Sequence, residues 1–141
     1  MLTNLRNNSM NFKIKSLKTE IRSSPIHGRG VFASRNIGAG EVVEVCPVIP
    51  IEDTESITAI EKTVLSDYVW QYGNGIAVVL GYGSLYNHSS EPNVDFGGGD
   101  NSIIYYATRD IEKGEELFVS YSEDPEKLRE WGIEEKVAGG A

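Results

Sequence analysis

Residues 80–96, "LGYGSLYNHSSEPNVDF", place Asn, His, Ser and Pro side chains between two apolar runs near the middle of the chain. Asn and His offer several hydrogen-bond donors and acceptors in a small space, and an Asn amide can bind a carboxylate or an adenine edge. The same residues could instead form an Asx-turn that leads into Pro92, with His88 packed as a satisfied histidine. By itself the stretch favours the turn, so the segments on either side of it decide its interpretation.

The flanking sequence predicts a mainly β domain. Short apolar runs of ordinary strand length are separated by glycine turns such as "HGRG", "IGAGE", "GYG" and "EKGEE", and "FGGGDN" predicts a hairpin loop. This spacing is typical of a sandwich or a barrel-like small β fold, and not of alternating βαβ units. The predicted strands are Leu17–Arg22, Val31–Ser34, Glu41–Cys46, Val48–Ile51, Ile76–Leu80, Asn93–Phe96, Ser102–Thr108 and Glu116–Ser120.

Two helices are predicted within this β pattern. The first begins at a cap formed by Asp53 or Thr54 and ends before Gly73. Its apolar residues at helical spacing are Ile57, Ile60, Val64, Leu65 and Tyr68. The second lies in "EDPEKLREWG", where Pro125 occupies a favourable first-turn position and Trp131 precedes Gly132.

Length and charge limit the classes of partner. The 141 residues suffice for one domain, and 13 Lys and Arg against 21 Asp and Glu give a formal net charge of −8. Such a surface repels phosphate backbones and anionic lipid, so we expect no direct nucleic-acid binding and no membrane binding. A basic protein or peptide is the favoured partner, although the acidity could also serve only solubility.

Cysteine and histidine are too few for a metal site or a disulfide. Cys46 is the only cysteine, and His27 and His88 are the only histidines, so one chain can form neither an internal disulfide nor a Cys/His zinc site. We therefore expect no bound metal. The sequence has no apolar run of 18 residues and no secretory h-region, which predicts an intracellular protein of the cytoplasm or nucleus, depending on its source. Residues 1–16 read as a flexible N-terminal extension, and Met10 is an alternative start.

Two further segments contain more glycine or polar residues than a plain β domain needs. In "SSPIHGRGVFA", residues 23–33, Gly28 and Gly30 allow a backbone to approach a ligand closely, although "HGRG" alone is more often a turn. It lacks the third glycine and the helix of a dinucleotide fingerprint. "IYYATRDIEKGEELFVSY" predicts a hairpin that ends on Tyr121, a position usually filled by a core or rim residue.

The order of the three segments changes this interpretation. "GRGVFA", then "NHSSEPN", then "RDIEKGEELFVSY" resembles the SET domain family of protein-lysine methyltransferases, most closely its small stand-alone viral and bacterial members. The resemblance covers residues 17–123 and implies a β-clip-like fold of short strands and small sheets, with a C-terminal pseudoknot and one or two short helices. Residues 124–141 would then form a short helix and tail that close the site, because no Cys or His follows Tyr121 to build the zinc segment of many members.

The resemblance also implies a cofactor and site residues. The cofactor is S-adenosyl-L-methionine, and the implied cofactor-binding residues are His27, Gly28, Arg29, Gly30, Asn87, His88, Tyr121 and Trp131. Tyr121 and Tyr68 are the implied catalytic residues, and Tyr68, Phe96 and Val119 the implied walls of the substrate lysine channel. The family pattern supplies these roles, which the spacing of the residues alone would not establish.

The expected function is methyl transfer from S-adenosyl-L-methionine to lysine in a basic protein or peptide, such as a histone-like tail. A catalytically silent SET-like module that only binds basic peptides is the alternative, and a plain β interaction domain is the third reading. A homodimer is one arrangement that could complete the pocket. Transfer of labelled methyl groups to basic proteins distinguishes these classes.

Overall fold

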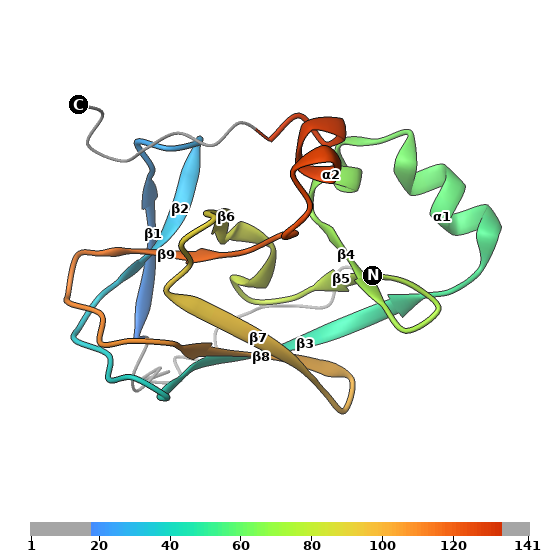
Figure 1. Cartoon of the computed structure of the whole chain (residues 1–141). Coiled ribbons are helices and arrows are strands. Elements are labelled where there is room, and N and C mark those ends of the chain that lie inside the picture. The colour runs from blue at the N-terminus through green and yellow to red at the C-terminus, as the bar shows by residue number, and fades with distance from the viewer. Residues whose placement is uncertain (1–17, 134–141) are drawn as a thin grey trace, which may run out of the picture.

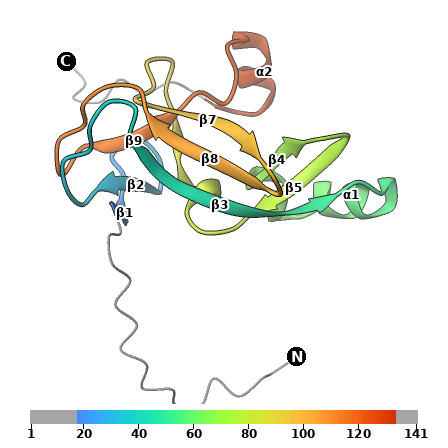
Figure 2. The same cartoon turned by 90° about the horizontal axis from the view of Figure 1, so that it is seen from below.

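The computed structural model describes residues 18–133, which form two curled β-sheets and two short helices (Figure 1). One sheet has the order β1 (Thr19–Ser23), β2 (Arg29–Ala33), β9 (Glu116–Val119) and β6 (Asn87–His88). The other has the order β4 (Val69–Tyr72), β5 (Gly75–Val79), β3 (Val42–Ile51), β8 (Ser102–Ala107) and β7 (Val94–Gly99) (Figure 2). The helices are α1 (Thr54–Glu61) and α2 (Pro125–Glu130). The mainly β architecture predicted from the sequence is therefore confirmed.

The last strand of the chain lies between two earlier segments. β9 pairs antiparallel with β2 and parallel with β6, where Asn87 faces Phe118 and His88 faces Val119 (Figure 1). Insertion of a late strand between two earlier segments is the topology expected of the pseudoknot that the resemblance implies. It brings all three sequence motifs into one sheet.

The core fills the space between the two sheets. Alternation along β8 buries Ile103, Tyr105 and Ala107, as the period of two in a half-buried strand requires. Leu117 and Val119 of β9 are buried in the same way, both with 0% of their surface exposed. The strand that carries the last motif is therefore fixed by packing on one face, and its other face is free to hold polar groups.

The first predicted helix is wrong over its second half. α1 ends at Glu61, Thr63 caps a short 3₁₀ turn, and Val69–Tyr72 is the strand β4. β4 turns into β5 through a hairpin in which Tyr72 pairs with Gly75 and Gly73 has φ of 54°, a left-handed conformation that glycine adopts without strain. "YGNG" is thus the hairpin signal that outweighs the continuing helical spacing. The second predicted helix is confirmed: α2 begins with Pro125, and Asp124 caps it.

Several predicted strand limits also differ from the structure, and one short strand was missed. The two predicted strands Glu41–Cys46 and Val48–Ile51 belong to the single strand β3. This strand pairs with β8 up to Pro47 and with β5 from Val48 on, and the missing N–H of Pro47 costs little at the change of partner. The glycines of "FGGGDN" lie inside β7, and the turn is Asp100–Asn101. The short strand β6 was not predicted.

Some sequence-based expectations concern residues that the structure does not describe. The N-terminal extension 1–16 and the end of the C-terminal tail, from 134 on, lie outside the described residues. Within 18–133, no helix is long and apolar enough to cross a membrane.

Candidate functional site

Asn87 joins the three motifs. It is 8% exposed, and its Nδ2 donates hydrogen bonds to the carbonyls of His27 at 3.2 Å and Arg29 at 3.1 Å, and to Oε1 of Glu116 at 2.8 Å. A Cβ on Gly30 would lie 2.1 Å from that Glu116 oxygen and 2.9 Å from the Asn87 nitrogen. Glycine is therefore required at position 30 for the loop to come this close to β6 and β9.

Glu116 is a site residue that the sequence did not reveal. Its Oε2 accepts a hydrogen bond from the Ser24 hydroxyl at 2.9 Å, while its Oε1 accepts from Asn87. One half-buried carboxylate thus connects β9 directly to Ser24, at one end of the loop that precedes β2, and through Asn87 to the other end at His27 and Arg29. The sequence carried no clear signal for it, because Glu116 lies on the face of β9 opposite the buried Leu117 and Val119, where a charged residue is ordinary.

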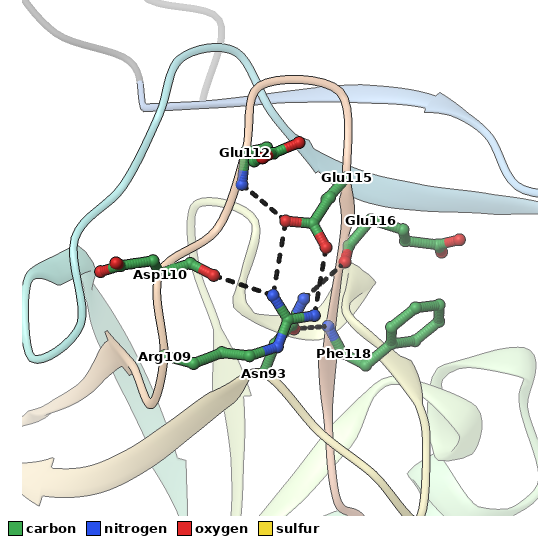
Figure 3. Close-up of polar contacts among 7 residues, drawn as sticks. All are labelled: Asn93, Arg109, Asp110, Glu112, Glu115, Glu116 and Phe118. Carbon is green, nitrogen blue, oxygen red and sulfur yellow. Dashed lines mark hydrogen bonds and ion pairs between the residues drawn. The ribbon is translucent and has the colours of Figure 1, made fainter.

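Asn93, the second Asn of "NHSSEPN", has a structural role. It is 2% exposed, its Nδ2 donates to the carbonyl of Glu116 at 2.9 Å, and its Oδ1 accepts from the N–H of Phe118 at 2.8 Å (Figure 3). These two bonds attach Asn93 to the backbone of β9 and satisfy two of its polar groups. Figure 3 also shows Arg109 bonded to both carboxylate oxygens of Glu115 in the turn before β9. Side-chain hydrogen bonds therefore fix both β9, through Asn93, and the turn before it, through Arg109.

Tyr121 lies at the end of the last motif, as the sequence predicts, and its hydroxyl donates a hydrogen bond to the carbonyl of Tyr86. Its backbone N–H donates to Nδ1 of His88 at 3.0 Å, and the two rings lie 5.3 Å apart. Although 37% of its surface is exposed, desolvation by its neighbours and, after it, the electrostatic effects of Glu116 and Tyr68 raise the pKa of Tyr121 to about 12. The hydroxyl therefore stays protonated at neutral pH and remains a hydrogen-bond donor.

A cleft of about 430 Å³ lies against the "GRG" segment. Its polar lining comes from Arg29, Tyr68 and Ser84, and the remaining walls are Val64, Leu65, Val69, Val78, Val79, Gly81 and Leu85. Ser84 and Leu85 of the lining precede Tyr86 in the chain, but neither Asn87 nor Tyr121 lines the cleft itself. A more open groove of about 460 Å³ between β3 and α1 is lined by none of the predicted site residues.

An aromatic cluster adjoins Tyr121 on the core side. Trp70 packs edge-on against Phe96 with ring centroids 4.6 Å apart, and against Tyr121 at 6.3 Å. Trp70, which the sequence-based prediction missed, therefore lies between Tyr121 and Phe96. Val119 is completely buried in the core beside His88. Val69 and Trp70 are neighbours on β4, so their side chains project to opposite faces, one toward the cleft and one toward this cluster.

The structure does not bring every predicted residue to the cluster. Trp131 is 52% exposed at the C-terminal end of α2, and no aromatic ring contact in residues 18–133 includes it. His27 is exposed and joins the site through its carbonyl rather than its ring. Tyr68 is 39% exposed and lines the cleft.

The chain belongs to the SET domain family, whose model matches residues 28–122. It is 37% identical to the Schizosaccharomyces pombe histone-lysine N-methyltransferase specific for H3 lysine-37, over 107 residues that cover 74% of this chain and 73% of that relative. Human histone-lysine N-methyltransferase 2B is 34% identical over 119 residues, which cover 70% of this chain and 4% of that protein.

A solved structure is also similar to this one. A Plasmodium falciparum protein described as a candidate histone methyltransferase matches with a TM-score of 0.62 and 33% identity, covering 79% of this chain and 98% of that one. Together with the family and the two relatives, this similarity supports lysine methyltransferase activity.

Proposed function

We propose that the protein is an S-adenosyl-L-methionine-dependent protein-lysine N-methyltransferase, with Tyr121 at the reacting centre. The observation that carries this proposal is the hydrogen bond from the Tyr121 hydroxyl to the Tyr86 carbonyl, in a chain whose cleft is lined by Arg29 of the "GRG" segment and by Ser84 and Leu85, which precede Tyr86. The hydroxyl proton is held by the carbonyl, and the oxygens of both groups keep lone pairs that can accept an amine N–H and the weak C–H contacts of a methyl group. The SET family of the chain and its histone-methyltransferase relatives support the same reaction.

The residues of the cleft fit the proposed cofactor. A volume of about 430 Å³ is within the range of ligand pockets, and apolar walls with a few polar groups suit a nucleoside and a short amino-acid chain. Arg29 and Ser84 would hold polar groups, and Val64, Leu65 and Val69 would cover the apolar part. When bound, S-adenosyl-L-methionine would supply a sulfonium methyl group, whose carbon bonds to the lysine nitrogen as the carbon–sulfur bond breaks.

The protein must hold the attacking lysine as a neutral amine. A free lysine has a pKa of about 10.4, so deprotonation near pH 7 costs about 4 to 5 kcal/mol. Desolvation beside the rings of Trp70, Tyr68 and Tyr121 lowers the pKa of the lysine, and no dedicated base is then needed. Tyr121 orients the amine and the methyl group, and such alignment contributes several kcal/mol.

The proposed substrate is a basic protein or peptide. A net charge of −8 attracts a basic chain and speeds its encounter with the site. Histones are the substrate class named for the S. pombe relative, and a histone-like tail is our first candidate, which would place the protein in the nucleus or cytoplasm with that substrate.

Incubation of the purified chain with labelled S-adenosyl-L-methionine and a panel of basic proteins tests the proposal. Transfer of label to lysine of at least one basic protein is expected. Binding of a basic protein without transfer to any of them would favour a silent peptide-binding module, and neither transfer to nor binding of any basic protein would reject both functions.

Asn87→Ala is expected to weaken S-adenosyl-L-methionine binding, because the loop of His27 and Arg29 loses its attachment to β6. Loss of a buried, hydrogen-bonded amide also lowers the free energy of unfolding by about 1 to 3 kcal/mol. Calorimetry measures the first effect and urea denaturation the second. Asn36→Ala, which removes a surface Asn bonded to the N–H of Lys113, is the control. Unchanged cofactor affinity in Asn87→Ala would remove this residue from the site.

The number of methyl groups added is expected to reach two or three. The resemblance implies that a tyrosine at either of two channel positions restricts the product, and here Phe96 and Val119 carry no hydroxyl. The alternative is that both are ordinary core residues that point away from the channel, and Val119 is completely buried, so the prediction depends mainly on Phe96. Mass spectrometry of a substrate peptide after long reaction is the measurement. Phe96→Tyr should shift the product toward monomethyl-lysine, while Phe32→Tyr, at a ring covered by Arg22, should not. A wild-type reaction that stops at one methyl with fresh enzyme and cofactor would contradict this view.

A further inference from the structure

Glu44 of β3 holds the segment that leads into the site. Its Oε1 accepts a hydrogen bond from the Tyr86 hydroxyl at 2.6 Å, and its Oε2 accepts from the N–H of Tyr82 at 3.4 Å. One carboxylate therefore contacts residues 81–86 at both ends. These residues supply Gly81, Ser84 and Leu85 to the cleft.

Tyr86 transmits this anchorage to the reacting centre. Its side chain is 1% exposed and stacks on Tyr105 with centroids 4.6 Å apart and an interplanar angle of 13°. The Tyr105 hydroxyl in turn donates to the carbonyl of Gly83 at 3.2 Å. The backbone carbonyl of the same Tyr86 accepts from the Tyr121 hydroxyl, so movement of the Tyr86 ring displaces the acceptor that faces Tyr121.

Residues 81–86 are tightly packed at Gly83. A Cβ on Gly83 would lie 2.3 Å from Cγ1 of Val79 and 2.9 Å from the Tyr105 hydroxyl, so the backbone is packed directly on its neighbours. Burial is the main cause that raises the pKa of Tyr86, and the charge of Glu44 raises this pKa further. The hydroxyl therefore remains a donor to Glu44 at any ordinary pH.

We infer that Glu44 is a positioning residue, which acts through the Tyr86 side chain to fix the Tyr86 carbonyl opposite the Tyr121 hydroxyl. This inference rests on the proposed methyl transfer, for which such a carbonyl must hold its place while the methyl group moves. An error of 1 Å at a reacting centre is costly, since the contribution of alignment depends on near-attack geometry.

Tyr86→Phe is the central test, because it removes only the hydroxyl and keeps the ring and the carbonyl. We expect kcat to fall about tenfold, as for loss of a hydrogen bond to a charged group. The cofactor Kd should change less than about twofold, because Tyr82 and Tyr105 still hold the cleft segment. Glu44→Gln, which keeps an oxygen to accept from Tyr86, should retain most of kcat, whereas Glu44→Ala should lose it and also weaken cofactor binding.

Tyr106→Phe is the matched control. It removes another hydroxyl-to-carboxylate bond, from Tyr106 to Asp95 at 3.0 Å, at an exposed position of β8, and should leave kcat unchanged. A purely structural role predicts that Tyr86→Phe lowers the melting temperature and keeps the wild-type kcat at assay temperatures well below melting. That result would overturn the inference.

Amide hydrogen exchange separates this inference from the proposed function. Exchange of residues 81–88 should become faster in Tyr86→Phe and Glu44→Ala and stay unchanged in Tyr106→Phe. If the wild type transfers no methyl group, the proposed function fails together with the catalytic half of the inference, and the exchange rates still decide whether Glu44 anchors the segment. Unchanged exchange would reject the anchorage even in an active enzyme.

Discussion

Tyr121→Phe is expected to reduce methyl transfer by about a hundredfold or more, because removal of one preorganised donor at a reacting centre typically costs about 10² to 10³ in kcat. The hydroxyl donates to the Tyr86 carbonyl, and the pKa of about 12 keeps its proton in place, so phenylalanine removes a donor that no neighbour replaces. The ring contacts with His88 and Trp70 remain, and the fold should be unaffected. Single-turnover kinetics with a basic substrate measure the loss.

Tyr72→Phe is the control for Tyr121→Phe. Tyr72 also donates its hydroxyl to a backbone carbonyl, that of Gly99, at 3.5 Å, but this bond links β4 to β7. Its loss should leave turnover near the wild-type value, and the cofactor Kd of both variants should stay close to that of the wild type. Near-native turnover of Tyr121→Phe would remove Tyr121 from the reacting centre and leave its hydroxyl a structural role.

The fold was predictable wherever local rules determined it. The period of two predicts β8, and Pro125 after Asp124 predicts the start of α2. The error over Val69–Tyr72 has a clear physical cause: apolar residues at helical spacing are compatible with both structures, and pairing with β5 selects the strand. Such a tertiary contact cannot be read from the spacing of the residues.

The candidate site was predictable only in its motif residues. Asn87 and Tyr121 lie in segments whose order resembles the family, and the pairing of β6 with β9 brings Asn87 close to Tyr121, which lies two residues past the end of β9. Glu116 and Trp70 were missed because their roles come from residues far away in the sequence, Asn87 and Phe96 respectively. A half-buried Glu and a Trp on a strand are common in any β domain, so only their partners distinguish them.

Gly30→Ala is expected to weaken cofactor binding at least about tenfold and to lower the free energy of unfolding by about 1 to 3 kcal/mol. The new Cβ would lie 2.1 Å from Oε1 of Glu116 and 2.9 Å from Nδ2 of Asn87. Both atoms end flexible side chains, but each is fixed by hydrogen bonds, so relief of the clash breaks the bond between Asn87 and Glu116 and moves the loop of Arg29. Isothermal titration calorimetry and denaturant unfolding measure the two effects.

Two comparisons show whether the clash is the cause. Gly38→Ala makes the same change where a Cβ meets nothing within 4 Å, so it should alter neither quantity. Glu116→Ala removes the nearer of the two clashing side chains, and the double variant Gly30→Ala/Glu116→Ala should therefore be less damaged than the sum of the single variants. Strict additivity in that cycle, or wild-type cofactor affinity in Gly30→Ala, would mean that the loop can move away without cost, and that the close contact among the "GRG" loop, Asn87 and Glu116 does not shape the cofactor site.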